Sequence, residues 1–344
     1  MQEIAPDHTV KLDRVGADIA IMPRHGSSFR RLTLIGSDGS QRHFIVQKSF
    51  APSARSDERI LQLFRVLNQM FDKHKESRRR HIYFNTPINI PVWSQVRMVE
   101  DDLMYSTFLE VYENHCVRND KEADHPITYF KEQLNQATSG QTSPEAIVDL
   151  RLQAYSDITK NLVTDRIFSQ YMYKMLLNAN HIWAFIKQFS IQFALSSFMS
   201  NMLQIGGRSP NKILFAKNTG KIYQTDFHPA YDANGMNEFN EPVPFRLTRN
   251  IQSFFSPFPQ WVRQPRLCFH LKQKVTENVE NVISRISGIA PRNFSEEEED
   301  AVDPPESVQK GVTELVEAAL TPRNLCMMDP RWHPWLNLYS WRQI

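Results

Sequence analysis

Residues 29–47 read Phe-Arg-Arg-Leu-Thr-Leu-Ile-Gly-Ser-Asp-Gly-Ser-Gln-Arg-His-Phe-Ile-Val-Gln. Two apolar, alternating runs stand on either side of Asp38-Gly39, a dipeptide that favours tight turns, and this pattern predicts a β-hairpin. The next periodic segment, residues 57–67, has apolar residues at helical spacing. Asp57 and Glu58 stand in its first turn, where the helix dipole favours acidic side chains. The sequence therefore predicts an antiparallel strand pair followed by a helix.

Strands and helices are also predicted on both sides of this unit. The further strands are expected at 18–22, 81–92, 213–216 and 221–225, and the further helices at 144–162, 165–178 and 182–205. Between them, residues 97–112 are expected to hold one more strand and a helix. This order predicts an α+β protein of two lobes, with a cleft near the loop at 206 and the strand end at 225.

Shifts in composition divide the chain into six segments. The predicted divisions are a lead-in at 1–16, an N-lobe at 17–113, a polar insert at 114–145 with one short helix at 129–134, a C-lobe core at 146–256, an atypical and partly disordered linker at 257–306, and a closing segment at 307–344 that starts with a helix at 307–320. The linker lacks helical periodicity at 257–273 and carries an acidic run at 296–300. The basic cluster at 73–80 is expected to end the first helix as a solvated loop.

The composition excludes several classes of protein. A net charge of +2 over 344 residues gives no bulk electrostatic attraction to nucleic acid or membrane, and 41% hydrophobic residues are enough for a real core. Eleven glycines against 20 prolines argue against a nucleotide-binding doubly wound sheet. Cys116, Cys268 and Cys326 are far apart and odd in number, which predicts reduced thiols rather than disulfides or a zinc site.

Two long motifs resemble a known family. Residues 243–249, Val-Pro-Phe-Arg-Leu-Thr-Arg, and the pair Asp226-Phe227 are similar to the kinase domain of the phosphatidylinositol-3-kinase-related kinases. Residues 324–336, Asn-Leu-Cys-Met-Met-Asp-Pro-Arg-Trp-His-Pro-Trp-Leu, resemble the FATC segment of the same family. The resemblance covers residues 17–256 and 307–336. It implies a two-lobed, protein-kinase-like fold of the phosphatidylinositol-kinase type with a C-terminal FATC helical segment. The aromatic residues Trp332 and Trp335 are expected to pack against the C-lobe.

The catalytic loop departs from the family pattern. The family's loop is Gly-Asp-Arg-His-Pro-Ser-Asn, whereas residues 206–212 are Gly-Gly-Arg-Ser-Pro-Asn-Lys. The resemblance therefore implies that Gly207 replaces the catalytic Asp, Ser209 the His and Lys212 the metal-binding Asn, whereas Arg208 is retained. The metal-binding triplet keeps Asp226 and Phe227 but ends in His228, where a glycine would give more backbone freedom.

The lysine that contacts the ATP phosphates is also in question. Counting from Phe44, the family's lysine falls on Gln47, and Lys48 is its neighbour. Side chains alternate along a strand, so Lys48 is expected to point to the opposite face. A sheet bulge would bring Lys48 to the phosphate side, and the sequence leaves that alternative open.

The degenerate loop best matches the non-catalytic, TRRAP-type branch of the family. That resemblance implies a nuclear pseudokinase scaffold in a SAGA-type histone acetyltransferase coactivator complex. Its partners would be the other subunits and transcriptional activators, without sequence-specific nucleic-acid binding, membrane attachment, cofactor or metal. An active kinase and a nucleotide-sensing pseudokinase are the alternatives. In the pseudokinase, Lys212 and Asp226 are expected to form an ion pair where an active relative holds magnesium.

Overall fold

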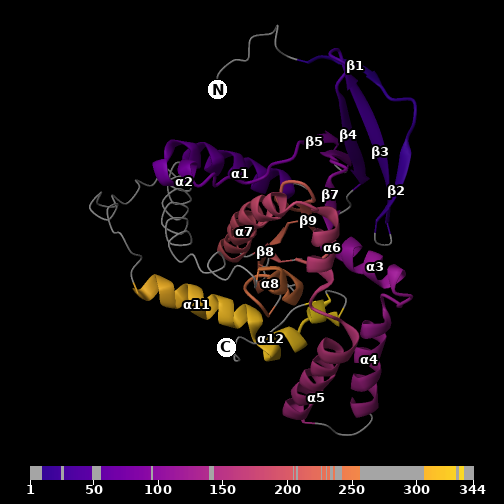
Figure 1. The fold of residues 1–344 in the computed structure, drawn as a ribbon, viewed down its shortest axis with the longest axis vertical. Coiled ribbons are helices and arrows are strands. Elements are labelled where there is room, and N and C mark those ends of the chain that lie inside the picture. The colour runs from indigo at the N-terminus through magenta and orange to yellow at the C-terminus, as the bar shows by residue number, and fades with distance from the viewer. Residues whose placement is uncertain are drawn as a thin grey trace.

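The structure is a computed structural model (Figure 1). It describes residues 10–24, 27–48, 56–93, 96–138, 143–203, 205–206, 208–225, 227–229, 231–232, 235–236, 242–255, 306–330 and 333–336. The linker features expected at 257–273 and 296–300 lie outside the described residues, as do Gly207, Asp226, Cys268 and Trp332.

An antiparallel sheet forms the N-lobe. Its strands are β1 (Leu12–Val15), β2 (Ala20–Arg24), β3 (Ser27–Gly36), β4 (Gln41–Lys48), β5 (Asn89–Trp93) and β6 (Val96–Glu100). The order is β1-β3-β4-β6-β5, and β2 also pairs with β3. The predicted hairpin is confirmed as β3 and β4, with Leu32 opposite Phe44. Gly39 has a φ of 79° in its turn, a conformation that glycine adopts without strain. β1 falls within the predicted lead-in and pairs with β3.

Helix α1 (Ser56–Lys73) follows the hairpin, as predicted, and joins the N-lobe to the rest of the molecule. Its inward side chains form one cluster with residues of helix α7 (Ala179–Met202); the cluster includes Leu61, Phe64, Phe71, Leu195 and Met199. The basic cluster after α1 is not a loop, because residues 75–79 form a short helix, α2 (Lys75–Arg79). Local bonds support the turn between them: the His74 ring accepts from the Ser77 amide at 3.4 Å, and the Arg78 amide donates to the His74 carbonyl at 3.0 Å.

The C-lobe is mainly helical. Its described elements are β7 (Tyr105–Thr107), α3 (Phe108–Arg118), α4 (His125–Thr138), α5 (Pro144–Asp157), a π-helical segment (Ile158–Leu162), α6 (Ile167–Met175), α7, β8 (Ile205–Gly206), β9 (Ile213–Ala216), β10 (Ile222–Gln224), β11 (His228–Pro229), β12 (Tyr231–Asp232), β13 (Gly235–Met236) and α8 (Arg249–Phe255). The rings of Phe108, Phe168, Phe189 and Phe215 lie within 6.4 Å of one another in its centre. These aromatic side chains fix how α3, α6, α7 and β9 pack together.

The predicted hairpin at 213–225 is confirmed as β9 and β10. Its turn ends at Gly220, which has a φ of 71°. A Cβ at this position would lie 2.9 Å from the carbonyl oxygen of Phe185, so the turn packs directly on the backbone of α7. Only glycine satisfies both conditions without strain.

The insert predicted at 114–145 holds a longer helix than the one predicted at 129–134. The structure has helix α4 over 14 residues, and α4 and α5 lie side by side at the end of the molecule opposite the sheet (Figure 1). Phe130 is fully buried, and Ile127 and Leu134 pack against the same core. These three side chains stand on one helical face, and burial of that face stabilises a helix that is otherwise polar.

The predicted closing helix is confirmed as α11 (Glu306–Leu320), and α12 (Pro322–Cys326) and a 3₁₀ turn (Pro334–Leu336) follow it. The segment completes the C-lobe core, because Leu325, Cys326 and Trp335 are fully buried there. The ring centroids of Trp335 and Phe130 are 6.1 Å apart. The predicted aromatic packing is thus confirmed for Trp335.

Two further sequence expectations concern thiols and membranes. Cys116 and Cys326 are buried free thiols, and burial raises the pKa of each above its ordinary value. Within the described ranges, none of the helices combines the length and the apolar character needed to cross a membrane.

The closing segment should contribute strongly to stability. We expect Trp335→Ala to lower the free energy of unfolding by about 3–5 kcal/mol, because it opens a cavity between α4 and the C-terminal turn. Trp93→Ala is the matched control, since Trp93 is 76% exposed, and it should change stability by no more than about 0.5 kcal/mol. Chemical denaturation of both variants tests this. Equal effects of the two substitutions would contradict the packing role of Trp335.

Candidate functional site

The N-lobe side of the cleft is built from two paired strands. Gln47 on β4 lies directly opposite Arg97 on β6 in an unbroken antiparallel register that runs from Phe44 to Lys48. Directly opposite residues share a face of the sheet, and the Arg97 Nε–H donates to Gln47 Oε1 at 2.9 Å. Lys48 is exposed and, by strand alternation, points away from this face. The register has no bulge at this point, so Gln47 rather than Lys48 faces the cleft.

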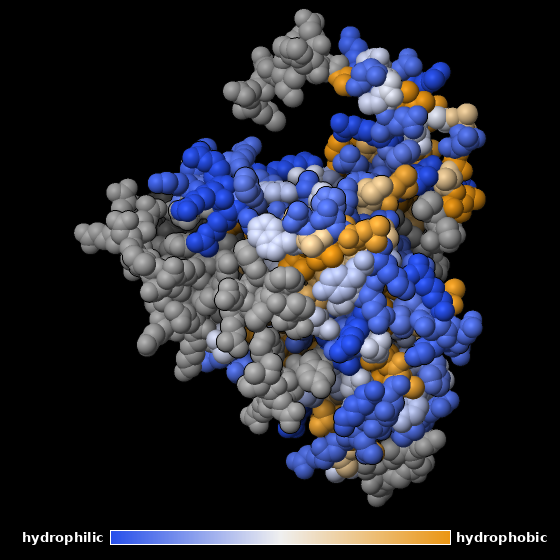
Figure 2. Space-filling model, viewed as in Figure 1, coloured by the Kyte–Doolittle hydropathy of each residue, from blue (hydrophilic) through white to orange (hydrophobic). Residues whose placement is uncertain are grey.

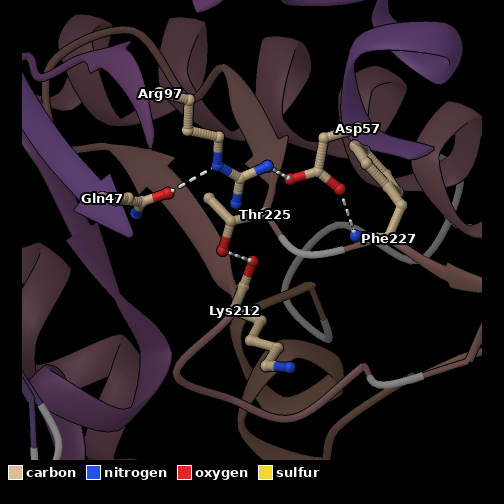
Figure 3. Close-up of polar contacts among 6 residues, drawn as sticks. All are labelled: Gln47, Asp57, Arg97, Lys212, Thr225 and Phe227. Carbon is tan, nitrogen blue, oxygen red and sulfur yellow. Dashed lines mark hydrogen bonds and ion pairs between the residues drawn. The ribbon is translucent and has the colours of Figure 1, made fainter. Parts of the chain in front are cut away.

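Asp57 connects the strand pair to the C-lobe. Its Oδ2 accepts from Arg97 Nη1 at 2.6 Å, and its Oδ1 accepts from the backbone N–H of Phe227 at 2.7 Å (Figure 3). Asp57 is 5% exposed and Arg97 is 9% exposed, so the ion pair is shielded from water. We call Gln47, Arg97, Asp57 and the Phe227 amide the interlobe bridge.

The position of Asp57 follows from the sequence. It is the second residue of α1, where the partial positive charge of the helix N-terminus favours a carboxylate. The α1 side chains that pack on α7 hold this helix end between the lobes. Phe227 belongs to the same cluster, and its ring meets the Phe64 ring edge-on at 5.9 Å. The bridge therefore lies beside a packed aromatic contact, which keeps the Phe227 amide aimed at the carboxylate.

The degenerate loop is hydrogen-bonded to the C-lobe through Arg208. Arg208 is buried, and its guanidinium donates to the carbonyl oxygens of Val243, at 2.8 Å, and Pro244. The Ser209 hydroxyl donates to the side-chain oxygen of Asn211 within the loop. Arg208 is thus a structural residue that connects the loop to the segment at 243–249.

Lys212 ends the loop and contacts the end of β10. Its carbonyl oxygen accepts from the Thr225 amide at 2.9 Å and from the Thr225 hydroxyl at 3.4 Å. Its side chain extends away from Asp57 and Arg97 (Figure 3). Asp226 lies outside the described residues, so the expected ion pair between Lys212 and Asp226 stays a prediction. The backbone of His228 pairs with that of Gly206, which places the two degenerate segments side by side.

Arg97 and Asp57 are site residues that the sequence analysis missed, since it assigned Asp57 only to the first turn of a helix. The strand of Arg97 has buried residues at alternate positions, Arg97 and Val99, so a charged side chain stands on the inward face. The sequence did not mark that face as inward, because Val96 and Met98 stand on the opposite face and are also apolar; once buried, an arginine requires an acidic partner. The partner, Asp57, is 40 residues away in the sequence. In the described part of the chain, no group of three or more His, Cys, Asp or Glu residues could hold a metal ion.

Comparison with known proteins assigns the chain to a family. The family model described as "Phosphatidylinositol 3- and 4-kinase" matches residues 49–293, and the FATC domain model matches residues 305–336. In fold, the chain is similar to a solved structure described as "FAT and kinase domain of CtTel1", with a TM-score of 0.74 and 16% identity over 97% of this chain and 25% of that one. The predicted kinase-like fold with a C-terminal FATC segment is confirmed.

Several similar sequences are transcription-associated proteins. The chain is 30% identical to the mouse "Transformation/transcription domain-associated protein" over 95% of its own length and 14% of that protein's. It is also 30% identical to the Saccharomyces cerevisiae "SAGA complex/NuA4 acetyltransferase complex subunit TRA1" over 72% of its length and 7% of that protein's. The chain thus spans a small part of these relatives. The family model covers well over half of the chain, which therefore belongs to the phosphatidylinositol 3- and 4-kinase family and carries a FATC domain.

Proposed function

We propose that the chain is a non-catalytic pseudokinase scaffold of a nuclear, SAGA-type histone acetyltransferase coactivator complex. The observation that carries the proposal is the interlobe bridge, in which Arg97 and Asp57 neutralise each other between the lobes. The similarity to the yeast acetyltransferase-complex subunit supports the choice of complex. Its partners are the other subunits of the complex and transcriptional activators. The acetyltransferase activity belongs to other subunits of the complex.

The cleft residues do not fit a magnesium nucleotide. An active kinase presents a lysine to the phosphates and carboxylate and amide oxygens to the metal. Here Gln47 faces the cleft with a neutral amide that already accepts from Arg97. Both oxygens of Asp57 accept hydrogen bonds from the protein. We therefore derive no phosphoryl-transfer step through this site.

The degenerate loop also lacks the general base and a metal ligand that phosphoryl transfer needs. Gly207 has no side chain that accepts a proton from a substrate hydroxyl, and loss of a general base alone costs roughly 10²–10⁴ in rate. Lys212 brings a positive charge to the position where the family has a metal ligand, which opposes metal binding. In this proposal the loop instead serves the fold, through the contacts of Arg208 and the Lys212 carbonyl.

Catalytic silence is the direct consequence. The purified chain should show no magnesium-dependent phosphate transfer to protein or inositol lipid in an assay that detects an active family kinase. Magnesium–ATP should leave the melting temperature unchanged, because a ligand raises it only when it binds the folded state. The Asp226→Ala variant should behave identically in both assays. Turnover, or an ATP-dependent rise in melting temperature, that disappears in this variant would sink the proposal.

The interlobe bridge should be strongly coupled. Asp57→Ala or Arg97→Ala leaves a buried charge without its counter-charge and should destabilise the protein by on the order of 3–5 kcal/mol. The double variant should lose less than the sum of the two. Arg42→Ala is the control, because Arg42 is 59% exposed and 4.0 Å from Glu100, and such pairs contribute about 0–1 kcal/mol. Urea denaturation measures all four variants, and simple additivity for Asp57 and Arg97 would refute the coupling.

The scaffold function is tested by assembly. The tagged chain, expressed in nuclei, should co-purify with histone acetyltransferase activity. Arg42→Ala should leave the recovered activity unchanged, since Arg42 is 59% exposed and lies outside the packed core. Trp335→Ala should reduce recovery, because it weakens the fold that presents the binding surfaces. Recovery of folded chain without acetyltransferase activity would overturn the scaffold assignment.

A further inference from the structure

A basic surface lies at the end of α1 and along α2. Residues 72–80 read Asp-Lys-His-Lys-Glu-Ser-Arg-Arg-Arg, which is five Lys or Arg against two acids and a formal net charge of +3. Lys73, Lys75 and Arg78 are exposed. Figure 2 shows hydrophilic residues gathered over α2 and the adjoining end of α1. We call the side chains of Lys73, Lys75 and Arg78 the α2 basic face.

The folded chain holds these cations on an ordered backbone rather than on the loop that the sequence predicted. The His74 amide donates to the Met70 carbonyl at 3.1 Å, and the Arg78 amide donates to the His74 carbonyl at 3.0 Å, so helical bonds connect α1 to α2. Ser77 is 5% exposed, and its hydroxyl lies 3.2 Å from His74 Nδ1. Lys75 and Arg78 are three residues apart and therefore neighbours on the helix surface. Because the backbone is already ordered, binding at this face would cost little ordering entropy.

Two acids lie in the same stretch. Asp72 is exposed and stands one turn before Lys75, so it offsets part of the positive charge there. Glu76 is the second acid. Helix α7, which packs on α1, contributes no Asp or Glu. The basic residues therefore outnumber the acids, and the stretch keeps a net positive charge.

Further cations stand next to the face. Arg79 and Arg80 follow it directly, and they make other interactions within the protein, so the face is defined without them. Lys221, at the start of the β9–β10 hairpin's second strand, lies over the Tyr83 ring with its Nζ 5.7 Å from the ring centroid. Tyr83 is three residues beyond Arg80 in the sequence. The positive charge thus extends beyond α2 itself.

We propose that the α2 basic face binds the phosphate backbone of double-stranded DNA without reading its sequence. The ammonium groups of Lys73 and Lys75 contact phosphate oxygens, and the Arg78 guanidinium donates to a phosphate with two of its N–H groups. Release of counterions from the DNA drives this binding. The inference rests on the proposed scaffold function only for the presence of chromatin beside the complex. The overall net charge of +2 does not conflict with it, because phosphates respond to the local charge within a Debye length.

The composition of the stretch favours duplex DNA over other polyanions. Residues 72–80 contain no Phe, Tyr or Trp on which the bases of a single strand could stack. They also contain no large apolar side chain that could enter a lipid bilayer or anchor an acidic peptide. Duplex DNA needs neither, because it presents its phosphates at high density on its outside. Single-stranded DNA, anionic vesicles and an acidic peptide are therefore outcomes of the test.

The test uses the full chain in fluorescence anisotropy titrations. The probes are two short DNA duplexes of unrelated sequence, a single strand of the same length and a peptide that alternates Glu with Leu. Sedimentation with phosphatidylserine vesicles tests lipid. We expect the two duplexes to bind equally, with a Kd of about 10⁻⁶–10⁻⁴ M at physiological salt, and the other probes to bind more weakly. The logarithm of the association constant should fall linearly with the logarithm of the salt concentration, with a slope of about −3 for three phosphate contacts.

Matched variants locate the binding. Lys75→Glu combined with Arg78→Glu should weaken duplex binding at least about tenfold and make the salt slope shallower by about 2. Lys121→Glu combined with Lys131→Glu is the control, because both lysines are exposed and the change in net charge is the same; it should leave duplex binding nearly unchanged. Lys75→Gln combined with Arg78→Gln removes the charges without reversing them and should also weaken binding. Equal melting temperatures of the variants show that the loss of binding is not a loss of fold.

Several results would overturn the DNA proposal. They are no binding of either duplex, unequal binding of the two duplexes, binding of the single strand, the vesicles or the peptide as tight as that of the duplexes, and equal weakening by the two charge-reversed double variants. If the chain co-purifies with acetyltransferase activity but does not bind duplex DNA, the DNA proposal fails and the scaffold proposal stands. If duplex DNA binds in the predicted way but the chain assembles with no acetyltransferase, the scaffold proposal fails alone.

Discussion

The buried carboxylate of Asp57 is the constraint on which the relation between the lobes depends. Removing a carboxylate from water costs several kcal/mol, so it is stable only when counter-charge and hydrogen bonds replace its solvent. Arg97 supplies the charge from the sheet, and the Phe227 amide supplies a hydrogen bond from the C-lobe. Because the three groups belong to separate elements, the carboxylate is satisfied only when the sheet, α1 and the segment at Phe227 are all in place.

The rest of the fold is held together mainly by aromatic packing. Phenylalanine rings of α3, α6, α7 and β9 meet in the C-lobe, and the FATC segment adds Trp335 to the same core. Such a core fixes the surface positions of residues that take no part in it. The kinase-like fold has a packed aromatic core, and the cleft residues Gln47, Arg97 and Asp57 are hydrogen-bonded within the protein. This arrangement suits the proposed scaffold, because a scaffold needs rigid surfaces and no catalytic cleft.

Local patterns predicted the elements whose own residues specify them. The hairpin of β3 and β4, α1, α7 and α11 carry clear periodicity and turn or dipole signals, and the structure has them at nearly the predicted positions. The extent of α4 and the existence of α2 were missed. The sequence of α4 is mostly polar, and its helix is stabilised by the burial of Phe130 against residues far along the chain. A window of sequence contains no information about that distant surface.

The family, the two-lobed fold and the degenerate loop were determined by the sequence alone, because they depend on which residues follow one another. Motif order is a property of the chain, so the substitutions at Gly207, Ser209 and Lys212 needed no coordinates. The interlobe bridge was decided only by tertiary structure, since Gln47, Asp57, Arg97 and Phe227 are brought together by strand register and helix packing. Strand alternation predicted which of Gln47 and Lys48 faces the cleft, but the absence of a bulge is a fact of the folded sheet. Long-range pairing energies, which no local pattern encodes, determined that arrangement.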